Sequence, residues 1–203
     1  MTLRSVFLMA SAVFLSGCAT TKMDASAPAS ENTKVDVSRT YEQDIERYSA
    51  GDTEYSGFYN NFEFKATILN SHVRSAMLTK RTAYYQWTDA QASSEREKSN
   101  QEMSSQTKVF MAFFTPNPKN DNLMDDKTIW RIYLDAGGRR YEGKPKRIRL
   151  LLAELQSLYP YMNRWATPYE VTFDVPTAAV ESGPSTYTVT GPLGTRSINF
   201  VGL

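Results

Sequence analysis

Phe62-Glu63-Phe64-Lys65-Ala66-Thr67-Ile68 is a stretch in which apolar and polar side chains alternate at every position. Successive side chains of a β-strand point to opposite faces, so this period of two predicts a strand with one buried face. A second stretch, Tyr169-Glu170-Val171-Thr172-Phe173-Asp174-Val175, repeats the pattern and is stopped by Pro176. The two stretches predict antiparallel sheets with one face on a core.

Other segments carry weaker strand signals between turn residues. Val109 to Phe114 is apolar throughout, which predicts a strand buried on both faces. The Gly137-Gly138 pair ends one expected strand, and the turn around Gly191 to Gly194 predicts a C-terminal hairpin. Further strands are predicted at residues 129–134, at about 140–141, and from about 145 to 150.

Three helices are expected from apolar residues at helical spacing. A short helix is predicted over Tyr41–Tyr48, with Gly51 ending it. Residues 73–105 contain neither Gly nor Pro and predict one long helix, packed in its first half and solvated in its second. Residues 145–158 fit either a strand or a helix; we favour a strand to about Leu150, followed by a short helix that ends before Pro160.

Together these elements predict a mainly β protein. About seven strands without βαβ alternation indicate an antiparallel β-sandwich, immunoglobulin-like, with one long inserted helix over about 73–105 and short helices elsewhere. The folded part resembles the immunoglobulin-like sandwich domains of bacterial lipoproteins that have no assigned activity. It lacks the Cys…Trp…Cys framework of true immunoglobulin domains, because Cys18 is the only cysteine.

The N-terminus carries a short positive segment, ten uncharged residues from Val6 to Leu15, and then Leu15-Ser16-Gly17-Cys18. That apolar run is too short to span a bilayer and is typical of a signal peptide. The four residues resemble the lipobox of bacterial lipoproteins, which implies cleavage between Gly17 and Cys18 and acyl chains (diacylglyceryl and palmitate) on Cys18. By the same resemblance, Ala19 in place of Asp favours the outer membrane of a Gram-negative cell, on its periplasmic side.

The expected organisation is a signal peptide at 1–17, a lipidated tether at 18–40 and a sandwich domain at 41–203. Removal of residues 1–17 takes away only Arg4, which leaves 22 basic and 22 acidic side chains. This balance argues against nucleic-acid binding, which needs an excess of Lys and Arg. No later apolar run is long enough for a transmembrane helix.

Few residues have a pattern that indicates catalysis. His72 is the only histidine, and no Gly-x-Ser-x-Gly elbow, dinucleotide fingerprint or phosphate loop is present. We therefore expect no cofactor, no metal and no catalytic residue, with His72 a polar residue at the start of a helix. Asp121, Asp125 and Asp126 cluster in one loop and are the carboxylates an envelope hydrolase would use, although their spacing fits no calcium loop.

The stretch from Arg139 to Arg149 has an excess of basic residues, which only Glu142 opposes, and we call it the basic run. At a membrane surface such a run can bind anionic lipid head groups, lipopolysaccharide phosphates or the acidic face of a partner; alternatively, it protects an edge strand from aggregation. The tryptophans Trp87, Trp130 and Trp165 either stack on sugars or fill the core. The leading hypothesis is a lipid-anchored, non-enzymatic interaction or structural module with an envelope protein or polymer partner; the alternatives are a hydrolase and a carbohydrate-binding module. The residues of the basic run are Arg139, Arg140, Lys144, Lys146, Arg147 and Arg149.

Overall fold

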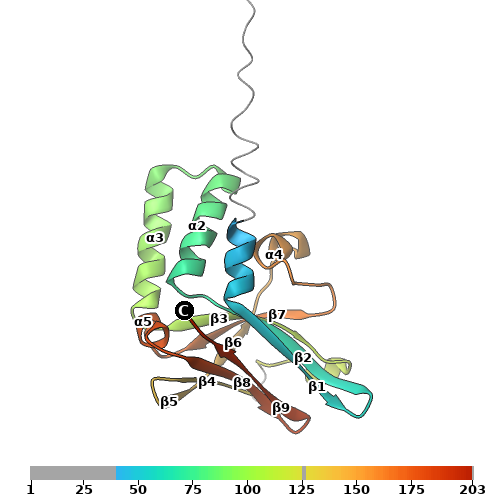
Figure 1. Cartoon of the computed structure of the whole chain (residues 1–203). Coiled ribbons are helices and arrows are strands. Elements are labelled where there is room, and N and C mark those ends of the chain that lie inside the picture. The colour runs from blue at the N-terminus through green and yellow to red at the C-terminus, as the bar shows by residue number, and fades with distance from the viewer. Residues whose placement is uncertain (1–39, 125–126, 203) are drawn as a thin grey trace, which may run out of the picture.

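The computed structural model describes residues 40–124 and 127–202, which form two antiparallel sheets with helices beside them (Figure 1). The larger sheet has the strand order β1-β2-β3-β7-β6 and the smaller one β5-β4-β8-β9. The strands of the larger sheet are β1 (Ser49–Ser56), β2 (Tyr59–Ile68), β3 (Thr107–Phe114), β7 (Thr167–Phe173) and β6 (Lys144–Arg147). Those of the smaller sheet are β5 (Arg139–Glu142), β4 (Arg131–Ala136), β8 (Ser185–Gly191) and β9 (Gly194–Phe200).

The helices are short or of moderate length. Residues 40–47 form the first helical segment. The others are α2 (Ser71–Tyr85), α3 (Asp89–Met103), the 3₁₀ turn η1 (Pro118–Asn120), α4 (Leu152–Leu158) and α5 (Thr177–Glu181). Among the described residues, none of the helices combines the length and the apolar character that crossing a bilayer requires.

The core lies between the two sheets, an arrangement consistent with a β-sandwich. The ring of Tyr187 on β8 lies 5.9 Å from that of Phe64 on β2 and 6.0 Å from that of Phe173 on β7. Its hydroxyl lies 3.2 Å from the sulfur of Met111 on β3. Trp130, just before β4, packs edge-on against Phe62 at 4.8 Å. Aromatic side chains from both sheets therefore interdigitate, and burying them supplies much of the driving force for folding.

The alternating stretches are strands, as predicted. The apolar members of the first stretch, Phe62, Phe64, Ala66 and Ile68, are all buried. In β7 the buried and half-buried positions alternate from Thr167 to Phe173. The prediction for Gly51 was wrong: it lies inside β1, an edge strand that the sequence reading did not expect. A side chain there would come within 2.7 Å of the Phe64 carbonyl oxygen, so the close pairing of β1 and β2 requires glycine.

The single long helix expected over about 73–105 was also wrong, because two helices occupy this stretch. Gln86 adopts a left-handed conformation with φ of 50° and ends α2. Thr88 then begins α3 with a capping box, in which its hydroxyl and the Gln91 side chain each bind the other's backbone N–H. The chain turns back on itself, and α3 packs beside α2 with half-buried residues but no fully buried one.

The helical segment 40–47, α2, α3 and α4 lie together on one side of the sheets (Figure 1). The ring of Phe110, on the outer face of the larger sheet, stacks on Tyr159 at 3.4 Å. The Tyr41 hydroxyl donates to the Leu158 carbonyl at 2.6 Å, and the Lys80 ammonium donates to the Ser157 carbonyl at 2.5 Å. These contacts tie the helices to one another and to the sheet.

Candidate functional site

A groove of about 780 Å³ lies between the α2–α3 pair, α4 and the strands β3, β7 and β6. We call it the helix–sheet groove. Residues 146–150, which lead from β6 toward α4, form part of its wall. The lining residues are spread between positions 69 and 170 of the sequence, so only the folded chain brings them together. Its apolar floor consists of Leu69, Met77, Leu78, Leu155, Leu158 and Tyr159.

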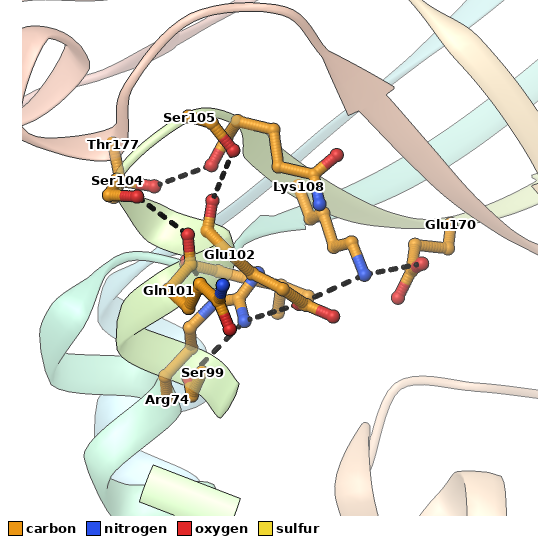
Figure 2. A network of polar contacts seen from close by, with 11 residues as sticks. Arg74, Ser99, Gln101, Glu102, Ser104, Ser105, Lys108, Glu170 and Thr177 are labelled. Carbon is orange, nitrogen blue, oxygen red and sulfur yellow. Dashed lines mark hydrogen bonds and ion pairs between the residues drawn. The ribbon is translucent and has the colours of Figure 1, made fainter. Parts of the chain in front are cut away.

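A network of charged side chains borders the groove (Figure 2). The Glu102 Oε2 atom lies 3.1 Å from both Arg74 Nη1 and Lys108 Nζ. Lys108 Nζ also lies 3.2 Å from Glu170 Oε1, and Arg74 Nη1 donates to Ser99 Oγ at 3.3 Å. The network thereby connects α2, α3, β3 and β7, which holds the walls of the groove in position.

The network also determines the ionisation state of Glu102. Burial raises the pKa of the Glu102 carboxyl, but the hydrogen bonds and charges of Lys108 and Arg74 outweigh burial and lower the pKa below its usual value. Glu102 is therefore a carboxylate at neutral pH. The two other acidic residues of the groove are also paired, Glu170 with Lys108 and Glu95 with Lys98.

Four basic side chains of the groove have no ion-pair partner within the described part of the chain. They come from α2 and from the stretch that begins in β6. Lys146, Arg147 and Arg149 are exposed beside the apolar floor, so their positive electrostatic field extends to any ligand in the groove. The four residues, which we call the free cations, are Arg81, Lys146, Arg147 and Arg149.

The basic run is divided between the two sheets. β5 pairs with β4 in the smaller sheet, whereas β6 pairs with β7 in the larger one. Arg140 is bound by Asp135 at 2.8 and 2.9 Å, and Lys144 by Asp174 at 2.5 Å. Both β5 and β6 are edge strands, where positive charge opposes aggregation. The structure brings only Lys146, Arg147 and Arg149 of the run into the groove.

The acidic loop and the histidine occupy other places. The Asp121 carboxylate accepts a hydrogen bond from the Thr167 hydroxyl at 2.6 Å, and its backbone carbonyl accepts from the Tyr169 hydroxyl at 2.6 Å. Asp125 and Asp126 lie outside the described residues. His72 is exposed in the first turn of α2, 6.0 Å from the Tyr48 ring. No group of three or more metal-ligating side chains occurs within residues 40–124 and 127–202.

The three tryptophans have different surroundings. Trp130 is buried in the core, and its indole N–H donates to the Asn120 carbonyl. Trp87 lies in the turn between α2 and α3, lines the groove, and stacks on Tyr85 at 5.8 Å. Trp165 is 69% exposed, with Arg164 over its ring at 4.8 Å. Only Trp87 belongs to the groove.

Gly17 and Cys18, the residues of the predicted lipobox cleavage site, lie outside the described residues. Comparisons of the chain with protein-family models, with curated proteins and with solved structures gave no match. The sequence reading did not single out Arg74, Arg81 or Lys108, because none of them belongs to a recognisable local motif. Only the register of the strands and the fold of the helices show that they share one groove.

Proposed function

We propose that this protein is a lipid-anchored lipoprotein of the cell envelope that binds an anionic partner in its helix–sheet groove. It acts without catalysis and faces the periplasm of a Gram-negative cell, at the outer membrane. The anchor is Cys18, for which the lipobox pattern Leu15-Ser16-Gly17-Cys18 is the support. Two or three acyl chains hold a protein at a membrane stably, whereas one chain binds only marginally.

The proposal that the groove binds an anionic partner rests on the positive charge of the groove. Seven basic and three acidic side chains line it, although the whole chain has a formal charge of only +1. All three carboxylates are paired, so the free cations remain for a partner. A positive, partly apolar concavity attracts anions from solution and strengthens their contacts once water is displaced.

The domain itself is, in our proposal, immunoglobulin-like. The order β2-β3-β7-β6 in one sheet and β5-β4-β8-β9 in the other corresponds to the ABED and C′CFG sheets of that fold, with β1 as an added edge strand. The buried Trp130 beside β4 occupies the place of the strand C tryptophan of immunoglobulin domains. The α2–α3 pair is then an insertion between the first two strands of the common core.

Photo-crosslinking in intact cells tests the binding proposal. A photoreactive amino acid at Leu150, which lines the groove, is expected to capture an envelope component. The matched control is Phe58, which is fully exposed in the β1–β2 turn and lies outside the groove. Equal capture from both positions, or capture from Phe58 alone, would contradict a binding role for the groove.

The anchor has its own test. The substitution Cys18→Ser removes the sulfur that would carry the diacylglyceryl group. We expect the variant to incorporate no labelled fatty acid and to keep residues 1–17. Normal processing and labelling of the variant would show that the lipobox assignment is wrong, whatever the groove binds.

Carbohydrate binding is a second candidate, carried by one observation. Trp165 exposes 69% of its surface on a loop before β7, and an exposed indole can stack on a sugar ring. Titration with peptidoglycan fragments should then quench its fluorescence in the wild type but not in Trp165→Ala. An unchanged spectrum in the wild type would end this candidate.

A further inference from the structure

The helix–sheet groove offers two chemically different surfaces to one ligand. Its floor is apolar, and the half-buried Ile148 and exposed Leu150 extend the apolar surface toward solvent. Its rim carries the free cations, three of which follow within four residues, from Lys146 to Arg149. A ligand that satisfies both surfaces must have an apolar part and an anionic part.

From this arrangement we infer that the groove binds a single anionic lipid. Its acyl portion lies on the floor beside Leu78 and Leu155, and its phosphate faces Lys146 and Arg149. The inference rests on the proposed function and names the ligand class for the same groove. Arg and Lys are the side chains that bind phosphate most effectively, Arg through paired N–H donors.

The hydrogen-bonding groups on the outer edge of β6 argue against an extended acidic peptide that would pair with β6 as an additional strand. Residues of an antiparallel strand direct their N–H groups alternately toward and away from the neighbouring strand. The Arg147 N–H donates to the Met124 sulfur at 3.0 Å, so it points away from β7. Pro145, two residues earlier, faces the same side and has no N–H. The outward edge of β6 therefore has no donor left for a new strand.

The size of the groove argues against an acidic helix. A helix with its side chains is about 11 Å across and rises about 5.4 Å per turn, so the groove would hold only about one and a half turns. The volume of about 780 Å³ instead falls in the range of small-molecule pockets, roughly 300–1,000 Å³. A lipid head group with part of an acyl chain suits this size.

Native mass spectrometry of the full chain in non-ionic detergent micelles tests the inference. Phosphatidylglycerol and phosphatidylcholine of the same chain length are added separately at equal concentration, and bound lipid is counted per protein. A glutamate-rich peptide forms a third arm. We expect bound phosphatidylglycerol to exceed phosphatidylcholine by about tenfold, because the free cations favour net negative charge.

Two pairs of variants locate the binding. Arg149→Glu should weaken phosphatidylglycerol binding about tenfold, whereas Arg139→Glu, the same change on the exposed edge of β5, should leave it within about twofold. Leu150→Ser should weaken binding about fivefold. Leu151→Ser is its control, because Leu151 is more exposed, at 79%, and does not line the groove.

The outcomes separate the lipid inference from the proposed function. Equal binding of both lipids, or equal effects of Arg149→Glu and Arg139→Glu, overturns the inference. A loss with Leu151→Ser equal to that with Leu150→Ser indicates contact with the micelle surface instead of binding in the groove, and it also overturns the inference. Binding of the acidic peptide without lipid overturns the lipid inference but leaves an anionic-partner function intact. Binding of neither probe, together with no capture from Leu150 in cells, refutes both.

Discussion

Replacing Lys80 tests the account of how the helices are held on the sheet. Lys80 is only 2% exposed, although it carries a charge. Its ammonium donates to the Ser157 carbonyl at 2.5 Å and lies 4.2 Å from the centre of the Tyr41 ring. One side chain of α2 thus joins α4 and the helical segment 40–47.

The expected cost can be divided between the charge and the carbon stem. Loss of the ammonium leaves the Ser157 carbonyl without this donor and removes a cation–π contact, but it also relieves the desolvation of a buried charge. We expect Lys80→Met, which keeps the stem, to lower the free energy of unfolding by about 1–2 kcal/mol. Lys80→Ala also removes the buried stem, so the loss should reach about 3–4 kcal/mol.

Urea unfolding of the full chain, followed by circular dichroism, measures both losses. Lys98→Ala is the control, because Lys98 is exposed on α3 and makes only a surface ion pair with Glu95; we expect a change within about 0.5 kcal/mol. Equal slopes against urea would show that the free energies are comparable. A Lys80→Met variant as stable as the wild type, or more stable, would refute the reasoning.

The pH dependence gives an independent check of the same residue. Burial lowers the pKa of Lys80, against a smaller opposing effect of Glu42. Between the lowered pKa and that of an unfolded lysine, about 10.4, the unfolded state binds more protons than the folded state. The stability of the wild type relative to Lys80→Met should therefore rise with pH through that alkaline window. A relative stability that falls there would show that the ammonium is favoured by folding.

Three other substitutions test the groove network, the core and the helix turn. Glu102→Gln should lower the free energy of unfolding by about 1 kcal/mol or less at pH 7, since solvent screens this half-exposed carboxylate. Because the pKa of Glu102 is lowered in the folded state, urea titrations should show this difference from wild type vanishing as the pH falls through that pKa. Gly191→Ala would place a Cβ within 2.8 Å of the Trp130 ring and should lower stability by about 2 kcal/mol. The control Gly183→Ala, which has open space around it, should lower stability by under about 1 kcal/mol, and thermal unfolding distinguishes the two. Thr88→Ala removes the capping box of α3 and should cost about 1 kcal/mol in the same assay; an unchanged midpoint would mean that α3 contributes nothing to global stability.

Local patterns were enough to predict most strands. The stretches 62–68 and 169–175 alternate because one face of each meets the core, and burial of that face is decided by residues only two positions apart. The turn at Gly137-Gly138 and the C-terminal hairpin also follow from neighbouring residues, since positive φ at glycine is a local requirement. Sheet content and the positions of these turns were therefore predictable.

The break between α2 and α3 was partly readable and was missed. Residues 86–89 contain neither Gly nor Pro, and absence of both favoured a continuous helix. The signal present was Thr88 followed three residues later by Gln91, a pattern that begins a helix. The left-handed conformation of Gln86 has no local signal, because glutamine is not among the residues that favour positive φ.

The sequence by itself determined the alternating strands and the turns, and it predicts a lipid anchor at Cys18, since each depends on residues close together in the chain. Only the tertiary structure decided which charges act together. The basic run is contiguous in sequence, yet β5 and β6 belong to different sheets, so its two ends separate. Conversely, Arg81 and Arg149 line the same groove although 68 positions separate them. Apart from hairpins, strand pairing joins residues far apart in the sequence, as helix packing does, and no local pattern specifies these partners.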